Sequence, residues 1–189
     1  MSSSPRLWPN PPGNSPLPLP SGAVFFSVQE ISDLQAPKMP DGEQIDLEGL
    51  REFVGAHILE DGTKVSDHID LQKCRPLLIA GELANPYRLC DIMAPKMPII
   101  PVRLENLCRT WADNLDSRDI NPGIHHVTIV RSPGWWERTF ITLVEPAEMK
   151  RIVKWLDSDN RNTWAPKRLA EGIIRLESDR EILPPSLDQ

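Results

Sequence analysis

The sequence predicts an α+β fold, in which about four helices pack on an antiparallel, hairpin-containing sheet in a single small domain. Segments with helical apolar periodicity and segments rich in β-branched and aromatic residues occur in separate runs. They lack the regular strand–helix alternation of a parallel sheet, which favours the α+β class. A concentration of proline in the first 22 residues predicts an extended arm before the domain. With 189 residues, 40% of them hydrophobic, the chain is long enough to bury a core of its own.

The arm, residues 1–22, holds seven of the 20 prolines and a single charged side chain, Arg6. Proline fixes φ and lacks an N–H donor, so this stretch is expected to be extended and similar to polyproline II. The globular domain is expected over residues 23–183, and residues 184–189 form a short tail.

The first elements of the domain follow from local patterns. The apolar run over residues 23–28 predicts a strand. Apolar residues at helical spacing over residues 47–58 predict a helix with Asp46 as its N-cap and Asp61-Gly62 as its stop signal.

The middle of the chain predicts a further helix and then a hairpin. An amphipathic pattern begins at Leu104 and continues through Leu107, Cys108, Trp111 and Leu115. Residues 124–131 and 136–144 have strand composition, and the segment 132–135, Ser-Pro-Gly-Trp, is expected to join them as a turn.

Two last helices are expected, one starting at Pro146 and one after Pro166. Residues 149–168, which cover most of the first of these helices and the start of the second, are the basic part of an otherwise acidic chain of net charge −6. Interleaved cations and tryptophans are typical of a surface for single-stranded nucleic acid, whereas the alternative is a solvated helix face. The candidate nucleic-acid-binding residues are Lys150, Arg151, Lys154, Trp155, Arg161, Lys167 and Arg168.

Common catalytic fingerprints are absent from the sequence. The ten glycines never lie closer than six positions apart, which excludes the GxGxxG and GxxxxGK[ST] phosphate loops. His125-His126 is the most conspicuous pair, but neighbours on a strand point to opposite faces, so the two cannot serve one site. Two half-buried histidines are one interpretation, and a hydrolase-like site centred on one of them is the other.

A metal site could use His57 with the cluster Asp67-His68-Ile69-Asp70, although these acids also suit helix N-termini. We expect neither a metal nor another cofactor. The three cysteines form no CxxC pair and are expected to be buried thiols in a reducing compartment. An apolar run long enough to span a bilayer and a signal-peptide core are both missing, so we expect an intracellular, non-secreted protein.

The segments best suited to contact a partner are the arm and the predicted hairpin tip. In the arm, the residues from Arg6, Leu7 and Trp8 through Pro9 to Pro12 fit RxxPxxP, the pattern of a ligand for SH3-type domains. The alternative is an arm that packs on its own or a neighbouring subunit. At the tip, Trp135 is expected at an interface, with Trp136 beside it.

The sequence therefore predicts a non-enzymatic interaction or assembly protein: an adaptor, a complex subunit or an accessory factor. Its contacts would be made by self-association or with a protein partner, not with a membrane. A nucleic-acid-binding accessory protein and a hydrolase-like enzyme are the alternatives.

Overall fold

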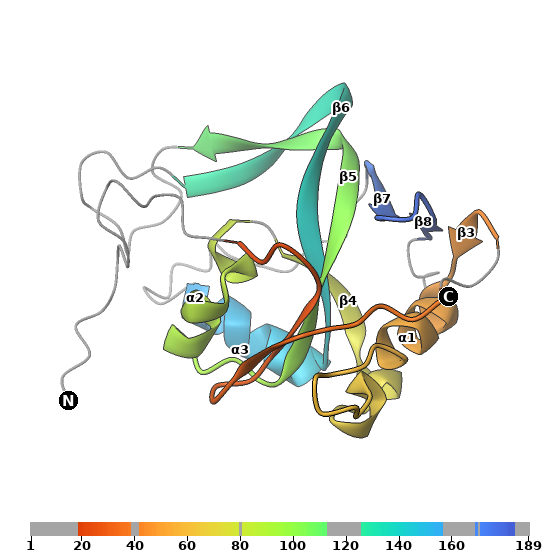
Figure 1. The fold of residues 1–189 in the computed structure, drawn as a ribbon. Helices are drawn as coiled ribbons and strands as arrows, with labels where there is room; N and C mark the ends of the chain where they lie inside the picture. The colour runs from red at the N-terminus through yellow and green to blue at the C-terminus, as the bar shows by residue number, and fades with distance from the viewer. Residues whose placement is uncertain are drawn as a thin grey trace.

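Strands dominate the fold of this protein (Figure 1). The structure is a computed structural model, and it describes residues 19–38, 42–79, 81–112, 126–156, 169 and 171–183. Eight strands form one sheet of mixed direction. They are β1 (Val24–Phe26), β2 (Ile31–Asp33), β3 (Gln44–Ile45), β4 (Arg75–Ile79), β5 (Met97–Ala112), β6 (His126–Val144), β7 (Ile173–Leu176) and β8 (Glu181–Ile182).

Helices contribute less than the sequence predicted. The described residues contain α1 (Leu47–Gly55), α3 (Pro146–Leu156) and the six-residue α2 (Pro86–Asp91), with short 3₁₀ turns at Val65–Asp67, Leu71–Lys73 and Gly81–Ala84. The prediction of an α+β domain with about four helices packed on its sheet is therefore wrong: the fold is built around the sheet.

The long strand β5 connects the parts of the sheet. It pairs antiparallel with β1 near its start, with β7 farther along on the same side, and with β6 over most of its length. Beyond β1 lies β2, and beyond β7 lie β8 and then β3, the last two paired in parallel. On the other side, β4 pairs with β6.

The helix expected from Leu104 is instead part of β5, because a β-bulge imitates helical spacing there. Leu104 and Leu107, three residues apart, are both buried. Between them the pairing register with β6 shifts, and Asn106 adopts a φ of 64°. A strand normally repeats every two residues, but a bulge shifts that repeat, so the two buried leucines fall at i and i+3.

Two other expectations fail in this part of the sheet. Instead of the last helix expected after Pro166, residues 173–176 form the strand β7, which pairs with β5 on the side opposite β6. The predicted turn 132–135 lies inside the continuous strand β6 and not at the end of a hairpin. The chain that does connect β5 to β6, residues 113–125, lies outside the described part.

The remaining local patterns form the expected elements. Residues 24–26 are the strand β1, and α3 begins at Pro146. Asp46 caps α1, since its Oδ1 accepts a hydrogen bond from the backbone N–H of Gly49 at 2.8 Å. That helix ends at Gly55, earlier than the expected stop at Asp61-Gly62.

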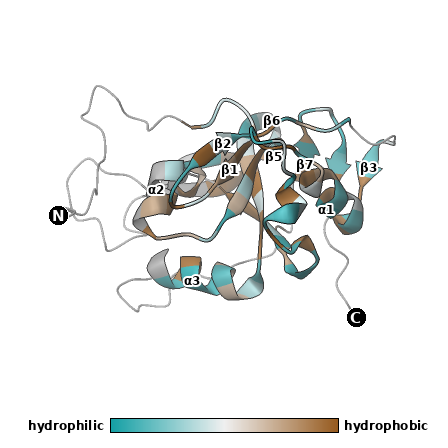
Figure 2. Cartoon of the chain, turned by 60° about the horizontal axis from the view of Figure 1, so that its bottom comes forward, coloured by the Kyte–Doolittle hydropathy of each residue, from teal (hydrophilic) through white to brown (hydrophobic). Residues whose placement is uncertain are grey.

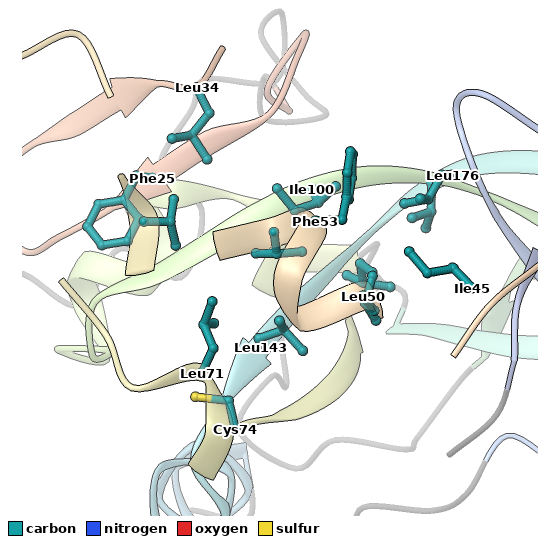
Figure 3. Close-up of a cluster of buried hydrophobic side chains, with 14 of the residues drawn as sticks. Phe25, Leu34, Ile45, Leu50, Phe53, Leu71, Cys74, Ile100, Leu143 and Leu176 are labelled. Carbon is teal, nitrogen blue, oxygen red and sulfur yellow. The ribbon is translucent and has the colours of Figure 1, made fainter. Parts of the chain in front are cut away.

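The two faces of the sheet bury separate apolar clusters. On one face, Leu50 and Phe53 of α1 pack toward Ile100, Leu143 and neighbouring residues (Figure 3). The other face carries a cluster that includes Phe26, Ile99, Phe140 and Ile152 of α3. Successive side chains of a strand point to opposite faces, so Ile99 and Ile100 belong to different clusters.

The distribution of hydropathy matches this arrangement. Figure 2 shows hydrophobic residues gathered in the strands near α2, whereas α1 and α3 carry many hydrophilic residues. Burying apolar area against both faces is the main stabilising contribution expected for such a fold.

His57 makes the fold sensitive to acid. It is 1% exposed, and its Nδ1 lies 3.0 Å from the carbonyl oxygen of Phe53. Burial lowers the pKa of His57 below its usual value of about 6.5, since the charged ring would lose its hydration. The unfolded chain then binds more protons below that pH, so the free energy of unfolding should fall as the pH drops from about 6.5 toward the lowered pKa.

We expect urea unfolding at a series of pH values to show this decrease in the free energy of unfolding. The variant His57→Gln should show a smaller decrease between a pH of about 6.5 and the lowered pKa of His57. An equal pH dependence in the variant would contradict the assignment to His57.

Candidate interaction surface

A large, irregular β-bulge in the β5–β6 pair forms the most distinctive surface of the described chain. Glu105 is opposite Trp136 and Leu107 is opposite Arg131, so Asn106 alone faces the four residues 132–135. Figure 1 shows both strands bending sharply partway along their length. Such a bend is what a bulge introduces.

The backbone of this bulge is held in place by a specific contact. Gly134 has a φ of 79°, a conformation favourable for glycine. Its N–H donates a hydrogen bond to Oδ1 of Asn106 at 3.0 Å. Asparagine is among the few non-glycine residues that adopt a positive φ readily, so both strands suit the bulge.

The bulge exposes two tryptophans, Trp135 and Trp136. Trp135 is 54% exposed and Trp136 is 61% exposed, and Val130 on the same strand is 40% exposed. We call Trp135 and Trp136 the tryptophan patch. Residues 132–135 lie in the bulge, where the register with β5 shifts, so the alternation of faces that holds along a regular strand does not apply to this pair. Trp135 is thus exposed, but it lies on a bulge and not at the predicted hairpin tip, and its place at an interface stays a prediction.

An ion-paired arginine supports the patch. The guanidinium carbon of Arg103 lies 5.9 Å from the ring centroid of Trp136, within range of a cation–π interaction. Arg103 also forms salt bridges to Glu105 at 2.7 Å and to Asp179 at 2.8 Å. Its charge is therefore shared between the ring and two carboxylates.

Three arginines lie side by side across β6, β5 and β7: Arg138, Arg103 and Arg175. Like charges opposite one another destabilise a sheet unless they are compensated. Here four carboxylates form salt bridges with them, those of Glu105, Glu177, Asp179 and Glu181. With four acids against three bases, this row lacks the excess positive charge that a phosphate-binding surface needs.

Arg138 connects this face to the first described residues of the chain. Its Nη2 donates a hydrogen bond to the carbonyl oxygen of Ser21 at 2.7 Å, and its Nη1 to that of Pro20 at 3.3 Å. Its Nε forms a salt bridge with Glu177 at 2.8 Å. The end of the proline-rich arm is therefore fixed to β6. The arm residues singled out in the sequence, Arg6, Leu7, Trp8, Pro9 and Pro12, lie outside the described part.

A second candidate site is an open groove of about 690 Å³ beside α1, which the side chain of His68 helps to line. Thr63 Oγ1 lies 2.6 Å from Oδ1 of Asp61 and 2.7 Å from Nε2 of His68. The Thr63 hydroxyl has one proton. Hydrogen bonds that Thr63 donates from its hydroxyl and from its backbone N–H lower the pKa of Asp61. If that proton goes to Asp61, the histidine must donate to the hydroxyl, which is the reverse of what a general base does.

The acids of the predicted metal cluster serve as local caps. Asp67 accepts a hydrogen bond from the N–H of Lys64, and Asp70 accepts one from the N–H of Gln72. His57 is buried elsewhere, against Phe53. Among the described residues, His, Cys, Asp and Glu side chains form no group of three that could hold a metal ion.

The other predicted residues are only partly placed. His125 lies outside the described residues, and His126 is described by its backbone alone. Lys150, Arg151 and Lys154 are exposed on α3, where Arg151 pairs with Glu148 at 2.9 Å and donates to the carbonyl oxygen of Met93. The side chains of Trp155, Arg161, Lys167 and Arg168 lie outside the described part, so the nucleic-acid interpretation stays a prediction.

Comparison with protein-family models, curated proteins and solved structures finds no match to this chain. In the described part of the chain, none of the helices combines the length and the apolar character needed to cross a bilayer.

Proposed function

We propose that this chain is a non-enzymatic assembly protein that associates with itself through the tryptophan patch. The observation that carries the proposal is the pair of exposed indole rings on a bulge with a defined backbone. Tryptophan is enriched among the residues that dominate binding energy at protein interfaces. A rigid scaffold under such residues lowers the ordering cost of binding.

The patch needs neighbouring surface in order to form a stable contact. The exposed parts of the two rings amount to roughly 100 Å² each, so burying both would contribute about 5 kcal/mol. Association itself costs about 4–15 kcal/mol in lost freedom of motion. An interface of lasting affinity therefore requires additional chain around the rings.

The compartment proposed for this assembly is intracellular and reducing. In the described structure, Cys74 and Cys108 form no disulfide. Cys74 is buried, and burial raises the pKa of its thiol, which keeps it protonated and unreactive. Both observations suit a protein that does not depend on oxidation.

The test is the mass of the full chain in solution, measured by sedimentation velocity from micromolar to millimolar concentration. We expect concentration-dependent association, and we expect Trp135→Ser/Trp136→Ser to weaken it at least tenfold, as loss of a central aromatic pair does. The matched control is Val28→Ser/Ile31→Ser, which removes two other exposed apolar side chains, on residues 51% and 40% exposed.

The control should associate like the unmodified chain, and all three proteins should give the same circular dichroism spectrum. A full chain that stays monomeric throughout, or a patch variant that associates normally, would contradict the proposed function.

A further inference from the structure

The tryptophan patch lies beside the point where the proline-rich arm joins the domain. Arg138 holds the carbonyl oxygens of Pro20 and Ser21 at 3.3 and 2.7 Å. Trp136 comes two residues before Arg138 on β6, so both side chains point to the same face of the sheet. The arm therefore leaves the domain on the face that carries Trp136.

The composition of the arm suits aromatic rings. A polyproline-II strip is already extended, so it loses little conformational entropy when it docks on an aromatic surface. Residues 6–12, Arg-Leu-Trp-Pro-Asn-Pro-Pro, combine three prolines with two large apolar side chains. This segment is the kind of ligand that recognition domains lined with aromatic side chains accept.

The charges of the two surfaces are also complementary. Arg6 is the one charged side chain of the arm. Two exposed carboxylates are held by arginines on the face of Trp136: Asp179 is bound to Arg103, and Glu177 is bound to Arg138, with side chains that are 73% and 56% exposed. An arginine in a proline-rich ligand is typically received by such acidic groups, since its guanidinium forms bidentate hydrogen bonds with carboxylates.

The length of the arm allows it to contact a neighbouring molecule. Alternating prolines at positions 16, 18 and 20 predict an extended root for the arm. At about 3.1 Å per residue, the eight residue steps from Pro12 to Pro20 are long enough to span about 25 Å. That length of chain is enough for residues 6–12 to contact a second copy.

The short distance between the start of the arm at Pro20 and the patch also suits a dimer in which each copy binds the arm of the other. In a two-fold symmetric pair the same surface of each copy meets that of the other. With root and patch on one face, each copy offers its arm where the other offers its patch. Once one arm is bound, the second contact forms within the same complex, which raises its effective concentration.

We propose that residues 6–12 of one copy bind Trp135 and Trp136 of a second copy, so that two copies exchange arms in a symmetric dimer. This inference rests on the proposed function, because it names the partner of the same patch.

The first test compares three full-chain proteins by sedimentation velocity. The arm variant Pro9→Ser/Pro12→Ser should raise the dissociation constant at least tenfold, and so should the patch variant Trp135→Ser/Trp136→Ser. The matched control Pro184→Ser/Pro185→Ser removes two prolines from the other end of the sequence and should associate like the unmodified chain. An arm variant that associates normally overturns the arm exchange; if the patch variant is defective in the same experiment, the proposed function stands.

The second test mixes the two defective variants. The arm variant keeps an intact patch, and the patch variant keeps an intact arm, so one arm–patch contact can form between them. A fluorescently labelled patch variant should sediment faster when the arm variant is added and should not respond to more unlabelled patch variant. Absence of this recovery up to millimolar concentration overturns the arm exchange, because direct contact between two patches cannot be restored by mixing.

Discussion

Phe140→Ala is expected to lower the free energy of unfolding by about 3–5 kcal/mol, the usual range for deleting a buried phenylalanine ring. Phe140 is 2% exposed and belongs to the apolar cluster formed with Phe26 and Ile99. The guanidinium carbon of Arg138 lies 5.5 Å from the centre of its ring. Loss of the ring therefore leaves a cavity and also removes support from the residue that holds the arm. Urea unfolding followed by circular dichroism measures the effect.

The same strand provides the matched control. Trp136 lies four residues from Phe140 on β6, but its residue is 61% exposed. Trp136→Ala removes mainly a cation–π contact with Arg103, so we expect a loss of about 1 kcal/mol or less. A destabilisation by Trp136→Ala as large as that of Phe140→Ala would show that Trp136 is part of the core, and its exposure would then carry no functional argument.

Gly172→Ala is expected to lower the free energy of unfolding by about 2–4 kcal/mol, combining backbone strain with overpacking. Gly172 has a φ of +87°, and a Cβ there would lie 2.6 Å from Cδ1 and 2.8 Å from Cγ of Leu107. The carbonyl oxygen of Glu105 would be 3.1 Å away. These two residues flank Asn106, so the chain before β7 packs directly against the bulge. The unfolding midpoint in urea measures the change.

Gly62→Ala separates the two contributions. Its φ of +85° is nearly the same, but a Cβ there would meet no atom within 4 Å. We expect a loss of about 1 kcal/mol from backbone strain alone. Equal losses in the two variants would contradict the close packing of Gly172 on Leu107.

Local signals in the sequence were sufficient for the elements that short-range chemistry determines. The cap at Asp46 and the start of α3 at Pro146 were predicted correctly, since each depends on residues within one helical turn. The long strands were not predicted correctly. The bulge at Asn106 breaks the two-residue repeat of β5, and the pairing partner that makes residues 173–176 a strand is about 70 positions away.

The candidate surface was predicted in part, for the same reason. Trp135 and Trp136 were singled out by residue type and by the Pro-Gly pair before them, which also indicates the positive φ of Gly134. Arg103 and Arg138 were not singled out from the sequence. Their roles depend on contacts across the sheet and, for Arg138, on carbonyl groups 117 and 118 positions away. No local pattern in the sequence reveals such pairings.

We propose the tryptophan patch as the contact surface of this protein. The most direct test of this claim is ¹⁹F NMR of the unmodified full chain labelled with 5-fluorotryptophan, with the signals assigned by single Trp→Phe substitutions. We predict that the signals of Trp135 and Trp136 shift as the concentration rises from micromolar to millimolar, in step with the increase in mass. An increase in mass that leaves both signals unchanged would contradict the claim, because the molecules would then associate through another surface.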